Sequence, residues 1–334
     1  MRILLAPMEG VVDPIVREMW TAIGGIDFCV TEFVRITSNL YPEKVFLRYA
    51  PELLQKSRTT SGVPVFTQLL GGDPRPMAEN AHRVAEMGAY GIDLNFGCPA
   101  KTVNRHDGGA ALLKNPDRIF RITEAVRKAV PKDKPVTVKV RLGFSDKSLS
   151  KDIAQAAECG GGHWLTVHAR TKEEAYRPPA HWECIAQMKD VVSIPVIANG
   201  DIWTVEDFHR CQRTSQCEDV MIGRGLIAKP DLALQIKEQT EQKSFHDYED
   251  FILQFITKSL AYRNESYAVQ RTKQLTKLMA RTYEESRGLF ECIKRLKTLT
   301  EILKEVQAFF LKRQRPPSVE SKSMSQRLAT QAML

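Results

Sequence analysis

The sequence predicts an α/β chain in which a (β/α)8 barrel is followed by a smaller all-helical domain. Short runs rich in β-branched residues alternate with stretches of helical period over the first 225 residues, the pattern of a parallel sheet closed into a barrel. After Pro230 the strand pattern stops, and residues 247–312 show helical periodicity alone. A doubly wound open sheet is the alternative fold, because periodicity by itself does not establish closure.

The predicted strands begin at intervals of about 25 to 45 residues, as a barrel of this kind requires. They cover residues 3–8, 28–33, 63–69, 91–95, 135–141, 164–169, 194–199 and 220–223. Amphipathic stretches between them predict helices over 76–87, 116–130, 151–159 and 204–211. In the C-terminal part the same period predicts helices over 248–263, 268–285 and 289–312.

These patterns divide the chain into a barrel, residues 1–240, and a helical domain, residues 241–312. The tail, residues 313–334, is rich in Pro, Ser, Gln and Lys, a composition typical of disorder.

The net charge of +8 is concentrated in one part of the 334 residues. Residues 1–257 carry 32 Lys and Arg against 33 Asp and Glu, whereas residues 258–315 carry 14 against 6. A basic excess confined to the helical part indicates a polyanionic partner, with nucleic acid ahead of a membrane surface. Taken alone, a solvated charged helix face explains the charge equally well.

Several classes of protein are disfavoured. No apolar run approaches the roughly 18–20 residues of a membrane span, and the N-terminus is too short for a signal peptide, so we expect a cytoplasmic and monomeric protein. Seven cysteines, an odd number, argue against a secreted disulfide framework. No Cys-x-x-Cys pair, Walker A loop or Gly-x-Gly-x-x-Gly motif occurs, so zinc, ATP hydrolysis and a Rossmann cofactor are not expected.

Polar residues close nearly every predicted strand at its carboxyl end, where this fold carries its chemistry. These strand-end residues are Glu9, Gln68, Asn95, Lys139, Arg141, His168, Arg170, Asn199, Asp201 and Arg224. A full ring of such residues is hard to explain by packing alone.

The loops after the last two strands resemble a phosphate cradle. Gly200 and Gly223 allow backbone N–H groups to approach an anion, and Arg224 adds a positive charge. The alternative is that both glycines only form tight turns.

A phosphate site beside Gln68, Lys139 and His168 predicts a bound flavin mononucleotide, FMN. Gln68 can hydrogen-bond the pyrimidine edge of the flavin, and Lys139 can stabilise the negative charge near N1 and O2 of the reduced ring. His168 can serve that edge or the phosphate. Each residue alone has a simpler interpretation, a salt-bridged lysine or a buried histidine.

Cys98 is the candidate catalytic residue. It lies between Gly97 and Pro99 on a strand-end loop, close to Asn95. A thiol with the ordinary pKa of about 8.5 is mostly protonated at neutral pH and can act as a general acid. A lone cysteine is otherwise more often buried and inert.

Basic residues also recur along the predicted C-terminal helices. Arg271, Lys273, Lys277 and Arg281 fall two to four residues apart, which predicts one broad basic face. Lys294 and its basic neighbours follow on the next helix. Such a face can follow a phosphate backbone.

Seven motifs together resemble the tRNA-dihydrouridine synthases over residues 1–310. They are Ala-Pro-Met (6–8), Asn-x-Gly-Cys-Pro (95–99), Gly-Ala-Ala-Leu-Leu (109–113), Val-Lys-x-Arg-x-Gly (138–143), Val-His-x-Arg-Thr (167–171), Asn-Gly-Asp (199–201) and Gly-Arg-Gly (223–225). Met-Glu-Gly near the start and Ile-Ala-Asn-Gly-Asp-Ile-Trp resemble the bacterial C subfamily, which modifies uridine 16 of the tRNA D-loop.

The resemblance implies an FMN-bearing catalytic barrel and a helical tRNA-binding domain. NADPH reduces FMN, hydride passes to C6 of a flipped-out uridine, and Cys98 protonates C5. The residues that would hold FMN are Pro7, Met8, Glu9, Gln68, Lys139, His168, Asn199, Gly200, Asp201, Gly223 and Arg224. Those that would contact tRNA are Arg35, Asn95, Arg141, Tyr176, Arg271, Lys273 and Lys294.

Two other functions compete with this one. A flavin reductase of free pyrimidines would use the same barrel and thiol, but it needs no basic helical domain. A non-catalytic tRNA-binding protein would not need the ring of polar strand ends.

Overall fold

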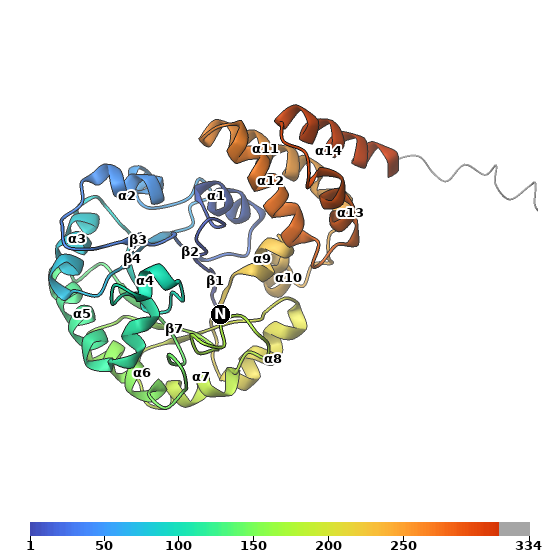
Figure 1. Ribbon diagram of the computed structural model, residues 1–334. Coiled ribbons are helices and arrows are strands. Elements are labelled where there is room, and N and C mark those ends of the chain that lie inside the picture. The colour runs from blue at the N-terminus through green and yellow to red at the C-terminus, as the bar shows by residue number, and fades with distance from the viewer. Residues whose placement is uncertain (314–334) are drawn as a thin grey trace, which may run out of the picture. The chain divides into compact units, whose positions relative to one another are not determined.

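A computed structural model describes residues 1–313, so the predicted tail lies, from residue 314 onward, outside the described residues. The chain forms two compact units, Met1–Gln242 and Lys243 onward. The first contains the sheet and the second is helical (Figure 1).

The first unit is built on a closed parallel barrel. The order of hydrogen-bonded strands is β2-β1-β9-β8-β7-β6-β5-β4-β3, and an additional β2–β4 pairing closes the ring. The strands are β1 (Ile3–Leu5), β2 (Phe28–Val30), β3 (Val34–Arg35), β4 (Val65–Leu70), β5 (Ile92–Asn95), β6 (Val136–Arg141), β7 (Leu165–His168), β8 (Val196–Asn199) and β9 (Val220–Ile222). Eight of them form the ring and β3 lies beside β4, so the (β/α)8 prediction is confirmed.

Helices surround this ring of strands (Figure 1). They are α1 (Pro14–Ile23), α2 (Glu43–Tyr49), α3 (Pro74–Glu86), α4 (Lys101–Asn104), α5 (Pro116–Ala129), α6 (Ser150–Cys159), α7 (Trp182–Lys189), α8 (Val205–Ser215), α9 (Arg224–Ala228) and α10 (Leu232–Glu238), with short 3₁₀ helices at Pro51–Gln55 and Gly109–Lys114.

Several of these helices begin at a side-chain cap. Asp13 accepts a hydrogen bond from the backbone N–H of Val16 at 2.9 Å, and Thr204 accepts one from Asp207 at 3.0 Å. Such caps satisfy backbone donors that have no partner within the helix. These two caps fix where α1 and α8 begin, after β1 and β8.

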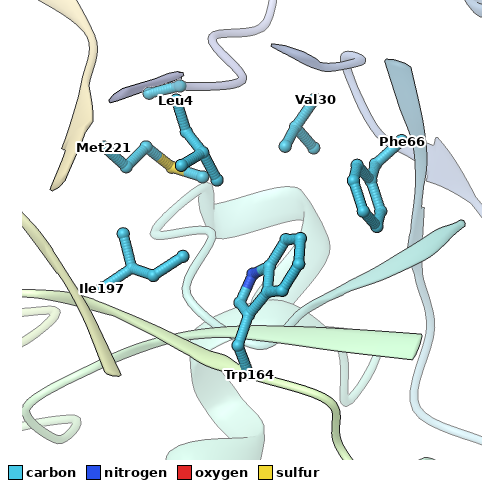
Figure 2. Packing of buried hydrophobic residues seen from close by; sticks show 7 residues of the cluster. Leu4, Val30, Phe66, Trp164, Ile197 and Met221 are labelled. Atoms are coloured by element: carbon cyan, nitrogen blue, oxygen red, sulfur yellow. The ribbon is translucent and has the colours of Figure 1, made fainter. Parts of the chain in front are cut away.

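Inside the barrel, apolar side chains fill the layers on the amino-terminal side of the polar strand ends. Figure 2 shows side chains from six different places in the chain pointing toward a common centre. The buried cluster consists of Leu4, Ala6, Val30, Phe66, Trp164, Ile197 and Met221. Because side chains alternate between the two faces of a strand, the next inward positions toward the carboxyl ends are the polar residues described below.

The predicted strand 28–33 is shorter in the structure: β2 ends at Val30, and a separate strand, β3, begins only at Val34. The backbone N–H of Gln68 donates to the Thr31 hydroxyl oxygen at 3.0 Å, and that hydroxyl donates to the carbonyl of Glu32 at 2.8 Å. The Thr31 side chain thus links the end of β2 to β4 at the point where the backbone hydrogen bonds between these strands stop. A threonine hydroxyl can do this because it bonds readily to nearby backbone groups.

The second unit contains four helices within the described residues. They are α11 (Glu249–Tyr262), α12 (Glu265–Met279), α13 (Glu284–Ile293) and α14 (Leu299–Arg313), preceded by a 3₁₀ helix at Phe245–Tyr248.

Two of the predicted C-terminal helices were wrong in their extent. The prediction of one helix over 268–285 misses the break after Met279, and that over 289–312 misses the break between α13 and α14. At the first break Tyr283 adopts an extended backbone and buries its ring against Phe245 and Tyr248. Ser286 donates to the carbonyl of Thr276 at 2.9 Å, so a carbonyl at the end of α12 gains a partner.

Among the described residues, no helix is both long and apolar enough to cross a membrane. No cluster of three or more His, Cys, Asp or Glu side chains suited to a metal ion occurs in residues 1–313.

Candidate active site at the mouth of the barrel

The strand register brings the predicted polar residues together at one end of the barrel. Gln68 pairs with Asp93 across β4 and β5, and Asn95 pairs with Lys139 across β5 and β6. His168 lies between Arg141 of β6 and Asn199 of β8 in the ladder. Residues 25 to 44 positions apart in the chain therefore become direct neighbours.

Hydrogen bonds hold the turn that carries Cys98 from both sides. Asn95 Oδ1 accepts the backbone N–H groups of Gly97 and Cys98 at 2.9 and 3.0 Å. The carbonyl of Cys98 accepts from Asn104 Nδ2 at 3.0 Å. Gly109 has a φ of +58°, and a Cβ there would lie 2.9 Å from the Cys98 carbonyl oxygen. This packing leaves Cys98 partly exposed in a fixed position.

The environment of Cys98 favours its protonated form. Burial raises the pKa of the thiol above its ordinary value. A backbone hydrogen bond near Ala100 and the positive charges of Arg141 and Lys139 act in the opposite direction, but they are outweighed. A protonated thiol suits a proton donor better than a nucleophile.

A buried acid and a lysine face each other below the mouth. Burial raises the pKa of Asp93 to about 6 and lowers the pKa of Lys139 to about 8. Lys139 Nζ donates to Asn199 Oδ1 at 3.1 Å, and Asn199 Nδ2 donates to the carbonyl of Met221 at 2.7 Å. The Lys139 side chain of β6 therefore reaches past β7 to the last residue of β8.

His168 is neutral at physiological pH. Burial lowers its pKa well below the ordinary value, and nearby cations lower it further. These cations are Arg141, Lys139, Arg170 and Arg224. Such a concentration of positive charge in a partly buried mouth favours an anionic ligand.

The loops after β8 and β9 meet at their glycines. Gly200 has a φ of +127°, and a Cβ there would lie 3.1 Å from His168 Cδ2. A Cβ at Gly225 would collide with the carbonyl oxygen of Ile202, so this glycine permits the close approach of the two loops. A Cβ at Gly223 would lie 3.2 Å from Met8 Sδ. Packing therefore explains part of the need for glycine here.

Asp201 links the arginines of this region. Its carboxylate accepts from Arg170 Nη2 and lies 3.5 Å from Arg224 Nη2. The guanidinium of Arg224 also lies 5.0 Å from the ring centroid of Tyr176 and 5.1 Å from that of Trp203. Arg224 is thus held by charge and by two aromatic faces.

Arg141 joins the Cys98 turn to the loop after β7. Its Nε donates to the carbonyl of Gly97 at 2.8 Å, and its Nη1 donates to the carbonyls of Thr171 and Ala175 at 3.1 and 3.0 Å. Its guanidinium lies 5.4 Å from the ring centroid of Tyr176, which is 54% exposed. Tyr176 therefore presents a partly exposed ring at the mouth, with two arginines near it.

The remaining predicted barrel residues lie at two other strand ends. Pro7 and Met8 are half-buried and Glu9 is exposed directly after β1, and the charge of Glu9 acts on Cys98. Arg35 is half-buried and ends β3, beside Leu70 at the end of β4.

The residues present fit an anionic flavin such as FMN. The hydroxyl of Thr166 is buried without a hydrogen-bond partner among residues 1–313, and its neighbour in the strand register is Lys139. The Nη1 of Arg170 is a second buried donor without a partner in this part of the chain. Unpaired buried polar groups are costly unless a ligand or water satisfies them. A lysine, a neutral histidine and several arginines supply the matching chemistry.

In the helical unit, the predicted basic residues do not share one face. Arg271 is only 5% exposed and lies 5.4 Å from the ring centroid of Phe255. Lys273 is half-buried and donates to the carbonyl of Leu296, whereas Lys294 is exposed and pairs with Glu291. The expectation of one broad basic face that includes Arg271 was wrong, because that position of α12 faces the core of the unit.

Sequence reasoning missed three residues that shape the site. Asp93 was detectable as an acid in an apolar strand, two positions before Asn95 and so on the same face. Trp203 and Asn104 had no comparable pattern, because their roles depend on loops that meet only in the folded chain.

Comparisons with known proteins find related sequences over most of the chain. A model of the dihydrouridine synthase family matches residues 4–332. The tRNA-dihydrouridine(16) synthase of Pseudomonas putida is 49% identical over 300 residues, which cover 88% of this chain and 93% of that protein. The protein of the same name from Shewanella oneidensis is 46% identical over 307 residues, covering 92% and 98%.

Solved structures resemble the barrel at low sequence identity. The old yellow enzyme homologue of Zymomonas mobilis has a TM-score of 0.51 and 15% identity, covering 72% of this chain and 90% of that chain. A 2-naphthoyl-CoA reductase has a TM-score of 0.56 and 12% identity, covering 71% and 50%. At this identity the likeness concerns the fold.

Proposed function

The chain belongs to the dihydrouridine synthase family, whose members are flavin-dependent oxidoreductases, and from this premise we propose that it reduces uridine 16 of tRNA to dihydrouridine. The bound flavin is FMN and the reductant is NADPH. The position of the target rests on the relatives named above, which carry it in their names.

The observation that carries this proposal is a protonated thiol at the rim of a positively charged barrel mouth. When bound, FMN reduced by NADPH supplies a hydride for C6 of the uracil ring. Cys98 Sγ donates the proton that C5 needs, so that the C5–C6 double bond becomes a single bond. The raised thiol pKa keeps that proton in place at neutral pH.

The residues around the thiol bind and orient the reactants. Lys139, held by Asn199 at 3.1 Å, places a positive charge where the flavin pyrimidine edge would lie. The neutral His168 offers a hydrogen bond without adding charge. Gly200, Gly223 and Arg224 form the phosphate end, with Asp201 fixing Arg224. Pro7, Met8 and Glu9 border the ring edge from β1. Gln68 was predicted to do so from β4, but its amide is fully buried and bonded to Asp93 and Asn95.

A uridine within folded tRNA reaches this mouth only after it leaves the base stack. The exposed part of the Tyr176 ring offers a stacking surface. Arg35 and the largely buried Asn95 and Arg141 are the other predicted contacts with the RNA. In the helical unit, Lys273, Lys294 and the largely buried Arg271 are the predicted tRNA contacts. The +8 charge of the chain supports an RNA substrate over a free pyrimidine.

A reconstituted reaction tests the proposal. Purified protein should show flavin absorbance, and with NADPH it should form dihydrouridine at position 16 of an unmodified tRNA transcript. A transcript with cytidine at position 16 serves as the control. Colourless protein that takes up no FMN, or dihydrouridine that maps to another position, contradicts the corresponding part of the proposal.

A further inference from the structure

A chain of side-chain hydrogen bonds runs from Asp93 to the turn that carries Cys98. Gln68 Nε2 donates to Asp93 Oδ2 at 2.7 Å, and Asn95 Nδ2 donates to Gln68 Oε1 at 2.9 Å. Asn95 Oδ1 then accepts the backbone N–H groups of Gly97 and Cys98. Three side chains and one turn are linked without interruption.

The direction of this chain is determined at both ends. A backbone N–H can only donate, so the oxygen of Asn95 must face the turn and its NH2 must face Gln68. An ionised carboxylate can only accept, so the NH2 of Gln68 must face Asp93. If either amide rotated by half a turn, two acceptors or two donors would meet in a buried site, which is costly.

Asp93 is well placed to impose this direction. Asp93 and Gln68 are fully buried and Asn95 is nearly so, so bulk water cannot replace a lost partner. Thr137 Oγ1 donates to the other carboxylate oxygen of Asp93 at 2.6 Å. Burial raises the pKa of Asp93 to about 6, which leaves the carboxylate ionised at neutral pH.

We infer that Asp93 is a positioning residue for Cys98. Asp93 acts through the amides of Gln68 and Asn95, and these amides fix the turn from which the Cys98 thiol donates its proton. The inference rests on the proposed function for the meaning of that thiol. A reacting group displaced by about 1 Å can lose about 10²-fold in rate, so a carboxylate two side chains away can control the reaction without touching a reactant.

Swapping the acid and the amide provides a sharp test. In Asn95→Asp alone, the Gln68 amide lies between two carboxylates. Its NH2 group can face only one of them, so the other carboxylate must face the Gln68 oxygen. The double variant Asp93→Asn with Asn95→Asp reverses Gln68 and restores every donor and acceptor, with the same charge and nearly the same volume as the parent. Asp93→Asn alone keeps the original direction, because Thr137 can turn its hydroxyl to accept. Thr137→Val is the matched control beside the chain.

Hydrogen exchange of the peptide that contains Gly97 and Cys98 is the readout, measured by mass spectrometry on the purified full-length protein. Asn95→Asp should exchange about tenfold faster or more, since repulsion between the new carboxylate and the Gln68 oxygen displaces the acceptor of two backbone N–H groups. The double variant should return to within about threefold of the parent, as should Asp93→Asn and Thr137→Val. A double variant that exchanges as fast as Asn95→Asp, or an Asn95→Asp that exchanges like the parent, overturns the inference.

A kinetic comparison separates this inference from the proposed function. In a single turnover of the reduced protein with tRNA, Asp93→Val should form dihydrouridine about 10²-fold more slowly than Asp93→Asn. The bound flavin of both variants should be reduced by NADPH at similar rates. Equal single-turnover rates remove Asp93 from the positioning of Cys98. Failure of the parent protein to form any dihydrouridine instead contradicts the proposed function and leaves the hydrogen-exchange result standing.

Discussion

At the residue scale, Cys98 combines a fixed backbone with a thiol that resists ionisation. The Asn95 amide, the Asn104 amide and the close approach of Gly109 all hold the same turn. Burial keeps the thiol protonated. Six other cysteines occur among the described residues, and none shares this setting at the barrel mouth.

Replacing Cys98 by alanine should separate the two halves of the reaction. Cys98→Ala should keep its flavin and its reduction by NADPH, because the thiol takes no part in either. Dihydrouridine formation should fall by about 10²- to 10⁴-fold, the usual contribution of a general acid. Cys159→Ala, at the exposed end of α6, is the matched control. Parental activity in Cys98→Ala would remove the thiol from the mechanism.

The alkylation of Cys98 should also report its raised pKa. Iodoacetamide reacts with the thiolate, so a raised pKa moves the rate profile to higher pH. We expect the midpoint for Cys98 to lie above the ordinary value of about 8.5 measured for unstructured peptides. Peptide mass spectrometry over a pH series gives the profile. A midpoint below that of a free cysteine peptide would contradict proton donation by this thiol.

At the scale of elements, the loops after β8 and β9 depend on a glycine. Gly200→Ala should place a methyl group 3.1 Å from His168 in a backbone conformation that disfavours side chains. We expect a loss of about 1–3 kcal/mol in the free energy of unfolding, together with a lower flavin content in purified protein.

Gly88→Ala is the control for that change. Gly88 also has a positive φ, of +91°, but a Cβ there meets nothing within 4 Å. Gly88→Ala therefore measures only the loss of stability that comes from placing a side chain on a residue with positive φ. Equal thermal stability and flavin content in the two variants would show that contact with His168 does not matter.

Helix α12 makes a different prediction for Arg271. The side chain is buried and packs against Phe255 and Tyr267, and it donates to Gln274. Arg271→Ala should lower stability by about 2–5 kcal/mol, the range for emptying a buried site. Thermal unfolding and tRNA binding, both measured on this variant and on the parent, check this result. A variant that loses tRNA affinity at parental stability would instead indicate direct contact with RNA.

At the scale of the whole molecule, the charge is divided between a nearly neutral barrel and a basic helical part. Residues 1–242 have a net charge of 31 − 30 = +1, whereas residues 243–313 have 14 − 9 = +5. The mouth of the barrel is positive all the same, because Lys139 and three arginines surround His168. The net charge of the chain and the positive potential at the barrel mouth therefore come from different residues.

The salt dependence of tRNA binding tests the role of the helical unit. Each phosphate contact contributes about 0.7–0.9 to the slope of log affinity against log salt concentration. The double variant Lys273→Gln with Lys294→Gln should therefore flatten that slope by about 1.5. Lys132→Gln, in the loop between α5 and β6 at the opposite end of the barrel strands, should leave it unchanged. An unaltered slope in the double variant would assign Lys273 and Lys294 to the solvated surface.

Much of the barrel followed from local patterns. The eight strand runs and their polar ends are visible in sequence, because strand period and strand-end chemistry are properties of short segments. The Cys98 motif and the basic C-terminal part are equally local. Helix ends within the second unit were less predictable, since the break at Tyr283 depends on Phe245 and Tyr248, residues distant in the chain.

The sequence alone determined the architecture, the ring of polar strand ends and the candidate proton donor. Only the tertiary structure decided how those groups act on one another. It placed Asp93 at the head of a hydrogen-bonded chain to Cys98, buried Arg271, and enclosed Arg224 between Tyr176 and Trp203. The physical reason is that periodicity fixes which face a residue occupies, whereas hydrogen-bond direction and burial depend on partners that only folding brings together.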